Sequence, residues 1–199
     1  MSAETPGVPG PKKVVLGDAN ALYSRVLRDY LVYAIDEGAI SIRWSAKILD
    51  EVVEHLVANR STFTTESGAR LVSLLNAAFP YAQVELTKSA QRRVRRLLLP
   101  DEDDRHVLVA AVAADAGVLC TDNIKHFPSQ VMAEVGIEAM TADALLAHLV
   151  REFPTEMLAA HRRTVVSLAG ATDESTIAAL RRTNAASTAD LMTALLGAI

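Results

Sequence analysis

Four acidic side chains, far apart in the sequence, are of a type that could share one metal ion. Asp18 follows the short apolar run KVVLG, and Asp122 follows a second such run, GVLCT. Glu51 lies in a helical pattern, and Asp104 closes the acidic string PDEDD. Carboxylates within about 4–6 Å of one another repel, and some take up protons unless a cation neutralises them. Ligands that are all oxygen favour Mg²⁺ or Mn²⁺ over zinc.

An ion held in this way would support a particular chemistry. Mg²⁺ bound by a few carboxylates keeps several waters, and one of these can be directed at a phosphorus atom. The ion also neutralises charge on the phosphoryl oxygens and on the leaving group. The acids therefore predict the hydrolysis of phosphodiester bonds.

Each acid also has a simpler explanation. Asp101 and Asp104 are three residues apart in the predicted first turn of a helix, where an acid contributes about 0.3–1 kcal/mol through the helix dipole. Asp18 could cap a helix and Asp122 a short turn. Glu51 could be an ordinary solvated acid, although its neighbours along the helix are apolar. Only the joint placement of the acids favours a shared site.

The elements that must position these acids alternate between strand and helix patterns. Short apolar runs predict strands at residues 13–17, 39–43, 83–86, 117–121 and 136–140. Helical spacing predicts helices at residues 19–37, 46–59, 65–78, 87–98, 103–116 and 142–151. This alternation predicts a parallel sheet with helices on both faces. Ligands bind such sheets at the carboxyl ends of the strands, where Asp18 and Asp122 would lie.

The pattern changes at Pro154. Three helical stretches follow, near 155–168, 173–183 and 187–197, without any strand signal. We therefore predict a flexible N-terminal arm at residues 1–12, an α/β domain at residues 13–153, and an all-helical C-terminal extension at residues 154–199.

Composition limits the class of protein. Half of the 199 residues are hydrophobic, which favours a folded core over disorder. The net charge of −4 excludes a globally basic nucleic-acid-binding surface but permits a local one. A single cysteine, Cys120, excludes an internal disulfide and fits a reducing compartment. No apolar run approaches the ~20 residues of a membrane span. We expect a soluble cytoplasmic protein without membrane contact.

Three strings, in this order, resemble the PIN-domain ribonucleases, and among these the VapC-like toxins of bacterial type II toxin–antitoxin pairs. The strings are VVLGDANALYSRVLRDYL, RWSAKILDEVVEHL and PDEDDRHVLVAAVAADAGVLCTDNIKHFP. The resemblance covers roughly residues 13–150. It implies a Rossmann-like three-layer α/β/α sandwich with a mostly parallel central sheet, a Mg²⁺ or Mn²⁺ site built from acids, and cleavage of RNA.

The resemblance assigns roles to the acids. Asp18, in the string DAN, is the primary metal ligand, and Asp104, before RHVLVAA, is a second ligand. Glu51 is the catalytic helix acid. The family motif after the fourth strand is Thr, any residue, then Asp or Asn, which puts Asn123 at the family position and Asp122 at the variable one. Charge favours Asp122 as the fourth catalytic acid, with Asn123 as the alternative.

Other residues near these motifs have supporting roles in the prediction. Asp101, Asn20 and Thr121 are expected to orient the ligands or replace one of them. Six arginines are predicted to contact RNA phosphates: Arg28, Arg92, Arg93, Arg95, Arg96 and Arg105. The alternative for those of the string QRRVRR is a solvated helix face, and the alternative for Arg28 and Arg105 is a pair with a nearby acid.

The expected function is therefore that of a metal-dependent endoribonuclease, acting as a toxin. Its expected partners are an RNA substrate, a cognate antitoxin protein and a second copy of the chain in a homodimer. Two alternatives stay open. One is a PIN nuclease in RNA processing with no antitoxin, and the other is a catalytically silent PIN-like scaffold that binds RNA or protein.

Overall fold

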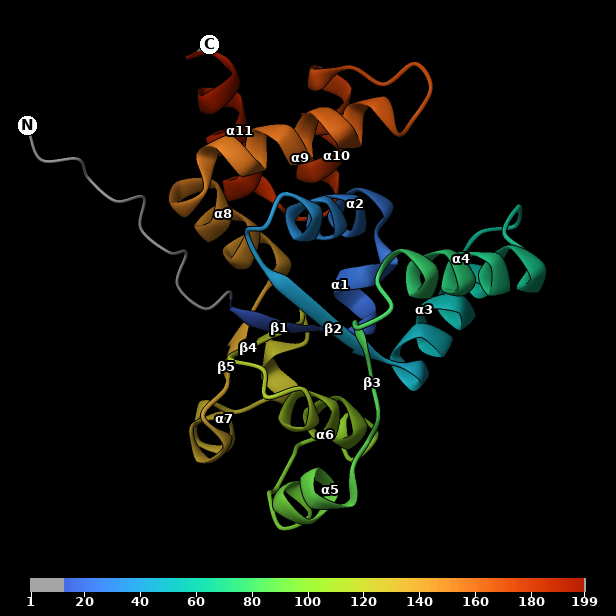
Figure 1. Ribbon diagram of the computed structural model, residues 1–199, viewed down its shortest axis with the longest axis vertical. Coiled ribbons are helices and arrows are strands. Elements are labelled where there is room, and N and C mark those ends of the chain that lie inside the picture. The colour runs from blue at the N-terminus through green and yellow to red at the C-terminus, as the bar shows by residue number, and fades with distance from the viewer. Residues whose placement is uncertain (1–12, 199) are drawn as a thin grey trace, which may run out of the picture.

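A sheet of five parallel strands forms the centre of the molecule (Figure 1). This computed structural model describes residues 13–198, so the arm predicted at residues 1–12 lies outside the described residues. The strands are β1 (Val14–Gly17), β2 (Ser41–Ser45), β3 (Gln83–Val84), β4 (Val118–Cys120) and β5 (Glu138–Met140). Their order is β3-β2-β1-β4-β5, and every pairing is parallel. The predicted α/β fold is confirmed.

The strand order creates a natural binding position beside β1. The chain runs outward from β1 through β2 to β3, and then returns to the other side of β1 for β4 and β5. Gly17 pairs with Cys120, so β1 and β4 end level with each other. The reversal of strand order between these two strands is where open α/β sheets bind their ligands. Asp18 and Thr121, the residues directly after them, therefore lie side by side at this edge.

Helices cover both faces of the sheet (Figure 1). In that view α5, α6 and α7 lie below the sheet, and α1, α2 and α8 lie above it. The bounds are α1 (Ala19–Tyr23), α2 (Arg25–Asp36), α3 (Ala46–Asn59), α4 (Thr65–Ala78), α5 (Lys88–Val94), α6 (Arg105–Ala113), α7 (Ser129–Val135), α8 (Ala142–Glu152), α9 (Pro154–Val166), α10 (Asp173–Arg182) and α11 (Ala186–Leu196), with one 3₁₀ turn, η1 (Ile124–His126).

The helix predicted over residues 19–37 is broken at Ser24. Ser24 has an extended backbone (φ −68°, ψ 124°), which separates the five-residue α1 from α2. The guanidinium of Arg28 donates to the carbonyls of Leu22 (2.7 Å) and Tyr23 (3.3 Å), which the break leaves without helical partners. The apolar spacing of a helix continues across Ser24, so this spacing did not reveal the break. The side chain of Arg28, one turn further on, stabilises the break.

The acidic string before α6 is not helical, contrary to the prediction. The helix expected from residue 103 begins at Arg105, and Asp101 to Asp104 form turns before it. The carboxylate of Asp101 accepts from the backbone N–H of Asp103 (3.0 Å). This local bond competes with helical hydrogen bonding, as is usual for aspartate near a helix start. Asp101 and Asp104 therefore do not share the first turn of a helix.

The C-terminal helices share the hydrophobic core of the sheet domain. Met157, Leu180 and Met192 are fully buried in the same cluster as residues of β1 and β4. At the surface, the contact between α9 and α2 is polar: Arg163 pairs with Asp36 (2.7 Å) and Glu37 (3.1 Å) at the end of α2. The extension is thus joined to the α/β layer through both apolar packing and ion pairs.

The described helices are not suited to a bilayer. Within residues 13–198, none combines the length and the apolar character that a membrane crossing requires.

Replacing Arg28 with Met is expected to destabilise the protein by about 1–3 kcal/mol, because two carbonyls at the α1–α2 break lose their donor. Urea unfolding measures the change. The matched control is Arg70→Met, on the exposed face of α4, which should stay within ~0.5 kcal/mol of wild type. Equal effects of the two substitutions would contradict the role given to Arg28.

Candidate active site

Asp18 is the most buried of the predicted site acids. It follows β1 and is 3% exposed. Its Oδ1 accepts from the N–H of Ala19 (2.7 Å), and its Oδ2 accepts from Asn20 (2.8 Å) and Thr121 (2.7 Å). Burial raises the pKa of Asp18, and the charge of Asp104 acts in the same direction, while these hydrogen bonds oppose it. The carboxylate is thus firmly positioned, yet costly to keep charged without a cation.

Thr121 and Asn20 hold Asp18 from the neighbouring strand end. The Thr121 hydroxyl donates its one proton to Asp18 and accepts from the side chain of Asn20 (3.1 Å) and the N–H of Asn123 (3.1 Å). The Asn20 carbonyl oxygen accepts from the N–H of Asp122 (2.8 Å). Thr121 thus uses its full hydrogen-bonding capacity. Both side chains therefore hold the Asp18 carboxylate in place.

Glu51 projects from the second turn of α3 and is held by a histidine. His106 Nε2 lies 2.8 Å from Glu51 Oε1. Burial raises the pKa of Glu51 to about 7; Lys47 opposes this shift, and the charges of Asp18 and Asp104 add to it. Burial lowers the pKa of His106 to about 4, so that its imidazole is a neutral donor near pH 7. Its Nδ1 is buried with no hydrogen-bond partner among the described residues.

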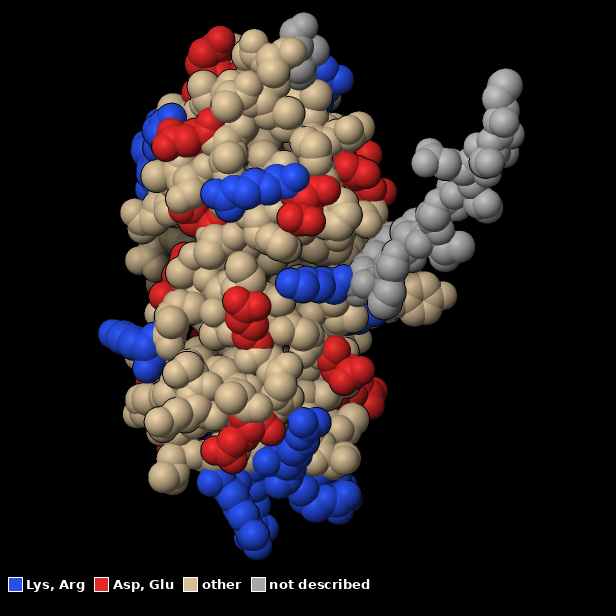
Figure 2. Space-filling model, turned by 90° about the vertical axis from the view of Figure 1, so that its left-hand side faces the viewer, with Lys and Arg blue, Asp and Glu red and all other residues tan. Residues whose placement is uncertain are grey.

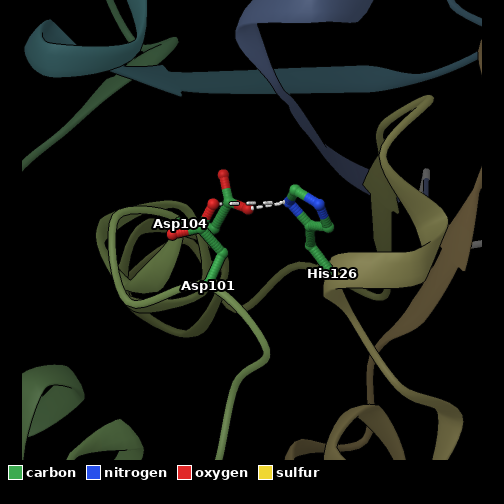
Figure 3. A group of neighbouring side chains, drawn as sticks. All are labelled: Asp101, Asp104 and His126. Atoms are coloured by element: carbon green, nitrogen blue, oxygen red, sulfur yellow. Dashed lines mark hydrogen bonds and ion pairs between the residues drawn. The ribbon is translucent and has the colours of Figure 1, made fainter.

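Asp104 meets a second histidine that the sequence analysis did not single out. His126 Nδ1 lies 2.5 Å from Asp104 Oδ2 and 3.9 Å from Asp101 Oδ2. Figure 3 shows the carboxylates of Asp101 and Asp104, both from the loop before α6, directed at the same imidazole nitrogen of His126 in η1. One ligand atom from each of the three residues lies within 4.8 Å of the others, as in a metal site.

Three of the predicted acids lie near enough to one another for their charges to interact. Of these three, only Asp104 belongs to the group with Asp101 and His126 whose ligand atoms could hold one ion among the described residues. The charges of Asp18 and Asp104 both act on Glu51, and the charge of Asp104 acts on Asp18. They come from the end of β1, from α3 and from the loop before α6, which are far apart in the sequence. The repulsion that follows from this placement is what a divalent cation would remove.

Asp122 and Asn123 take other positions. Asp122 Oδ1 accepts from the N–H of Ala142 (3.2 Å), so its carboxylate lies at the start of α8. The backbone N–H of Asn123 supports Thr121, and Asn123 also begins the turn η1 that carries His126. Neither side chain is among the groups that shift the pKa of Asp18 or Glu51.

The predicted arginines divide into two groups. Arg105 pairs with Glu102 (2.5 Å) and donates to the carbonyls of Val94 (2.8 Å) and Leu97 (3.0 Å), so that, like Arg28, it ties the backbone together. Arg93 donates to the carbonyl of Val135 (3.2 Å).

The rest of the basic string faces solvent. Arg92, Arg95 and Arg96 are exposed on and after α5. Figure 2 shows Lys and Arg side chains gathered at the lower end of the molecule, the end at which α5 lies. These three remain available to a polyanion.

The donor set at this site fits a divalent metal ion. Asp18 and Asp104 would supply oxygen ligands, and a cation beside them would offset the burial and the negative charge that raise the pKa of Asp18. Asp101 and His126 provide further donors beside Asp104. Because His126 adds a nitrogen, the set suits Mn²⁺ as well as Mg²⁺. The signal that could have pointed to His126 is its position in TDNIKHFP, just after the strand whose end lies beside Asp18.

The family of the chain follows from a comparison with family models. Residues 13–125 match the PIN domain, and this stretch is more than half of the 199 residues. The chain therefore belongs to the PIN-domain family, whose members are typically nucleases that use divalent metal ions. Neither the curated proteins nor the solved structures contained a match to it.

Replacing Glu51 with Gln is expected to stabilise the ion-free protein above about pH 7. The pKa of Glu51 is about 7 in the folded state and 4.5 ordinarily. Between these values the folded state holds the extra proton, so wild type loses stability as the pH rises through this window. The advantage of the variant should therefore be near zero below about pH 4.5 and of order 1–3 kcal/mol above about pH 7.

Urea unfolding in EDTA across this range measures the difference. Asp50→Asn, at the exposed position beside Glu51 on α3, is the control and should show no such pH dependence. A constant offset between wild type and Glu51→Gln at every pH would contradict the raised pKa.

Proposed function

We propose that this protein is a Mg²⁺- or Mn²⁺-dependent endoribonuclease that cuts phosphodiester bonds with water. The observation that carries the proposal is the meeting of Asp18, Glu51 and Asp104 at the carboxyl edge of the sheet, where burial and mutual repulsion raise the pKa of two of them. A purely structural role does not account for three acids that destabilise one another when no cation is bound.

The residues divide the work in the following way. Asp18 and Asp104 hold the ion, and Asp101 and His126 support Asp104 or join it as ligands. A bound Mg²⁺ or Mn²⁺ would supply positive charge to the phosphoryl oxygens and lower the pKa of water. Glu51, with a pKa of about 7, is suited to accept a proton near neutral pH.

Other side chains keep these groups in position. Thr121 and Asn20 fix the Asp18 carboxylate, and His106 fixes that of Glu51. Water attacks phosphorus in line with the leaving 3′ oxygen. The new bond from the water oxygen to phosphorus forms as the bond from phosphorus to the 3′ oxygen breaks. The products carry a 5′-phosphate and a 3′-hydroxyl. Asp122 acts by capping α8 next to the site, and Asn123 acts through Thr121.

RNA is the proposed substrate because a basic surface accompanies the acids. Arg92, Arg95 and Arg96 form an exposed group on and after α5, the helix that precedes the Asp101–Asp104 loop. Sequence-independent binding of nucleic acid depends on such contacts with phosphates.

Asp18→Asn is expected to abolish the cutting of single-stranded RNA in Mn²⁺, by about 10²-fold or more, because the primary ligand loses its charge. Cleavage of a labelled RNA on a denaturing gel measures the loss. Asp50→Asn, an exposed acid on α3, is the matched control and should cut like wild type.

Two further measurements separate this function from a silent scaffold. Mn²⁺ should raise the melting temperature of wild type and not that of Asp18→Asn, because an ion that binds only the folded state stabilises it. If wild type and Asp18→Asn bind RNA equally, and neither cuts it, the scaffold alternative is right and the nuclease proposal is wrong.

We further propose that the nuclease acts as a toxin in the cytoplasm, as a homodimer, and that an antitoxin protein silences it. The resemblance of its three motifs to VapC-like toxins supports this role. Induced expression in a bacterial host should arrest growth, and co-expression of the adjacent gene should relieve the arrest. Expression of Asp18→Asn to the same level is the control and should leave growth unchanged. Normal growth with active wild-type enzyme would favour an RNA-processing nuclease.

A further inference from the structure

A pocket separate from the candidate active site lies between the PIN domain and the C-terminal helices. It has a volume of about 380 Å³ and is lined by residues from the start of α2, the end of α3, the end of α9 and the length of α10. Its lining includes three arginines and several apolar side chains, among them Arg25, Arg60, Arg182, Val26, Leu168 and Ala179. We call it the arginine pocket.

The arginine pocket carries an excess of positive charge. Asp29 is the one acid in its lining, and it pairs with Arg25 (3.4 Å). No carboxylate within residues 13–198 forms an ion pair with Arg60 or Arg182. Three cations against one anion are unusual in a protein whose net charge is −4. An anionic ligand would restore the balance.

Groups around the arginine pocket add to its positive charge. Arg28 lies nearby, and burial lowers its pKa; the charge of Asp29 opposes this shift, and the charges of Arg60 and Arg25 add to it. The Arg60 guanidinium lies 5.6 Å from the ring centroid of Tyr23, the last residue of α1. An exposed cation beside an aromatic ring can contact both the phosphates and the bases of single-stranded nucleic acids.

The position of the pocket relates it to the proposed catalytic site. Ser24 and Arg25 line the pocket, and Asp18 caps the other end of α1. Since α1 has five residues, its length is about 7.5 Å. The backbone of α1 thus links the proposed catalytic site to the pocket over a short stretch of chain.

We propose that the arginine pocket binds a single-stranded segment of the RNA substrate outside the cleavage site, with phosphates on Arg60 and Arg182 and a base against the apolar floor. This inference rests on the proposed nuclease function. An acidic peptide could match the charge, but the planar guanidiniums, the apolar floor and the nearness of α1 favour RNA.

Fluorescence anisotropy with a fluorescein-labelled single-stranded RNA of mixed sequence tests the proposal. The background is Asp18→Asn, so that RNA is not cut. Arg60→Gln/Arg182→Gln should weaken binding about tenfold and lower the slope of log K against log salt by about 1.4, since each phosphate contact on a single strand contributes about 0.7.

Matched variants control for charge and folding. Arg70→Gln/Arg151→Gln removes two exposed arginines outside the pocket and should bind RNA within about twofold of the background protein. Arg60→Lys/Arg182→Lys keeps the charge and should recover most of the salt slope. Thermal unfolding should show both Gln pairs folded at the assay temperature, because all four side chains are exposed and only the contact of Arg60 with the Tyr23 ring is lost.

The outcomes distinguish this inference from the proposed function. If wild type cuts the RNA in Mn²⁺ but both Gln pairs bind it equally, the pocket assignment is wrong and the nuclease function stands. If poly-glutamate competes as well as unlabelled RNA does, the pocket is a site for acidic protein segments, and the RNA assignment fails. If wild type neither binds nor cuts RNA, both proposals are wrong.

Discussion

The arrangement of the site depends on one costly constraint, a carboxylate buried where two parallel strands end. Asp18 is kept in place by Thr121 and Asn20, which bond to it and to each other across the ends of β1 and β4. Hydrogen bonds orient the carboxylate but do not cancel the cost of its charge, because burial still raises its pKa. Glu51 and Asp104 increase that cost. A metal ion would turn this destabilising cluster into a stable one.

The two histidines show how the fold prepares this cluster. His106 on α6 contacts Glu51 on α3, and His126 in η1 contacts Asp104 in the loop before α6. Each imidazole thus holds a carboxylate that comes from a different element. A low pKa keeps His106 neutral near pH 7, so it orients Glu51 without neutralising it. The negative charge of the cluster is left for a cation.

Arginines serve two purposes in this chain, and burial separates them. Arg28 and Arg105 donate to backbone carbonyls and stabilise a helix break and a loop. Arg60 and Arg182 stay exposed and have no ion-pair partner in the described part of the chain. Sequence position did not separate these groups, since Arg28 is close to Asp18 along the chain and Arg60 is not. The C-terminal helices contribute to the second group, because α10 carries Arg182 to the pocket.

The sequence by itself determined the α/β class of the fold and the edge of the sheet at which the candidate acids were expected. Buried strands appear as short apolar runs and helices as spaced apolar positions. Because the carboxyl ends of parallel strands share one edge of the sheet, Asp18 and Asp122 were predicted to lie at that edge. Only the tertiary structure decided which side chains complete the site. The break at Ser24, the loop of Asp101 to Asp104, and the contacts of His106 and His126 all depend on partners distant in the sequence or on competition between local hydrogen bonds. Such contacts leave no periodic signal, because they are set by how elements pack and not by the order of residues within one element.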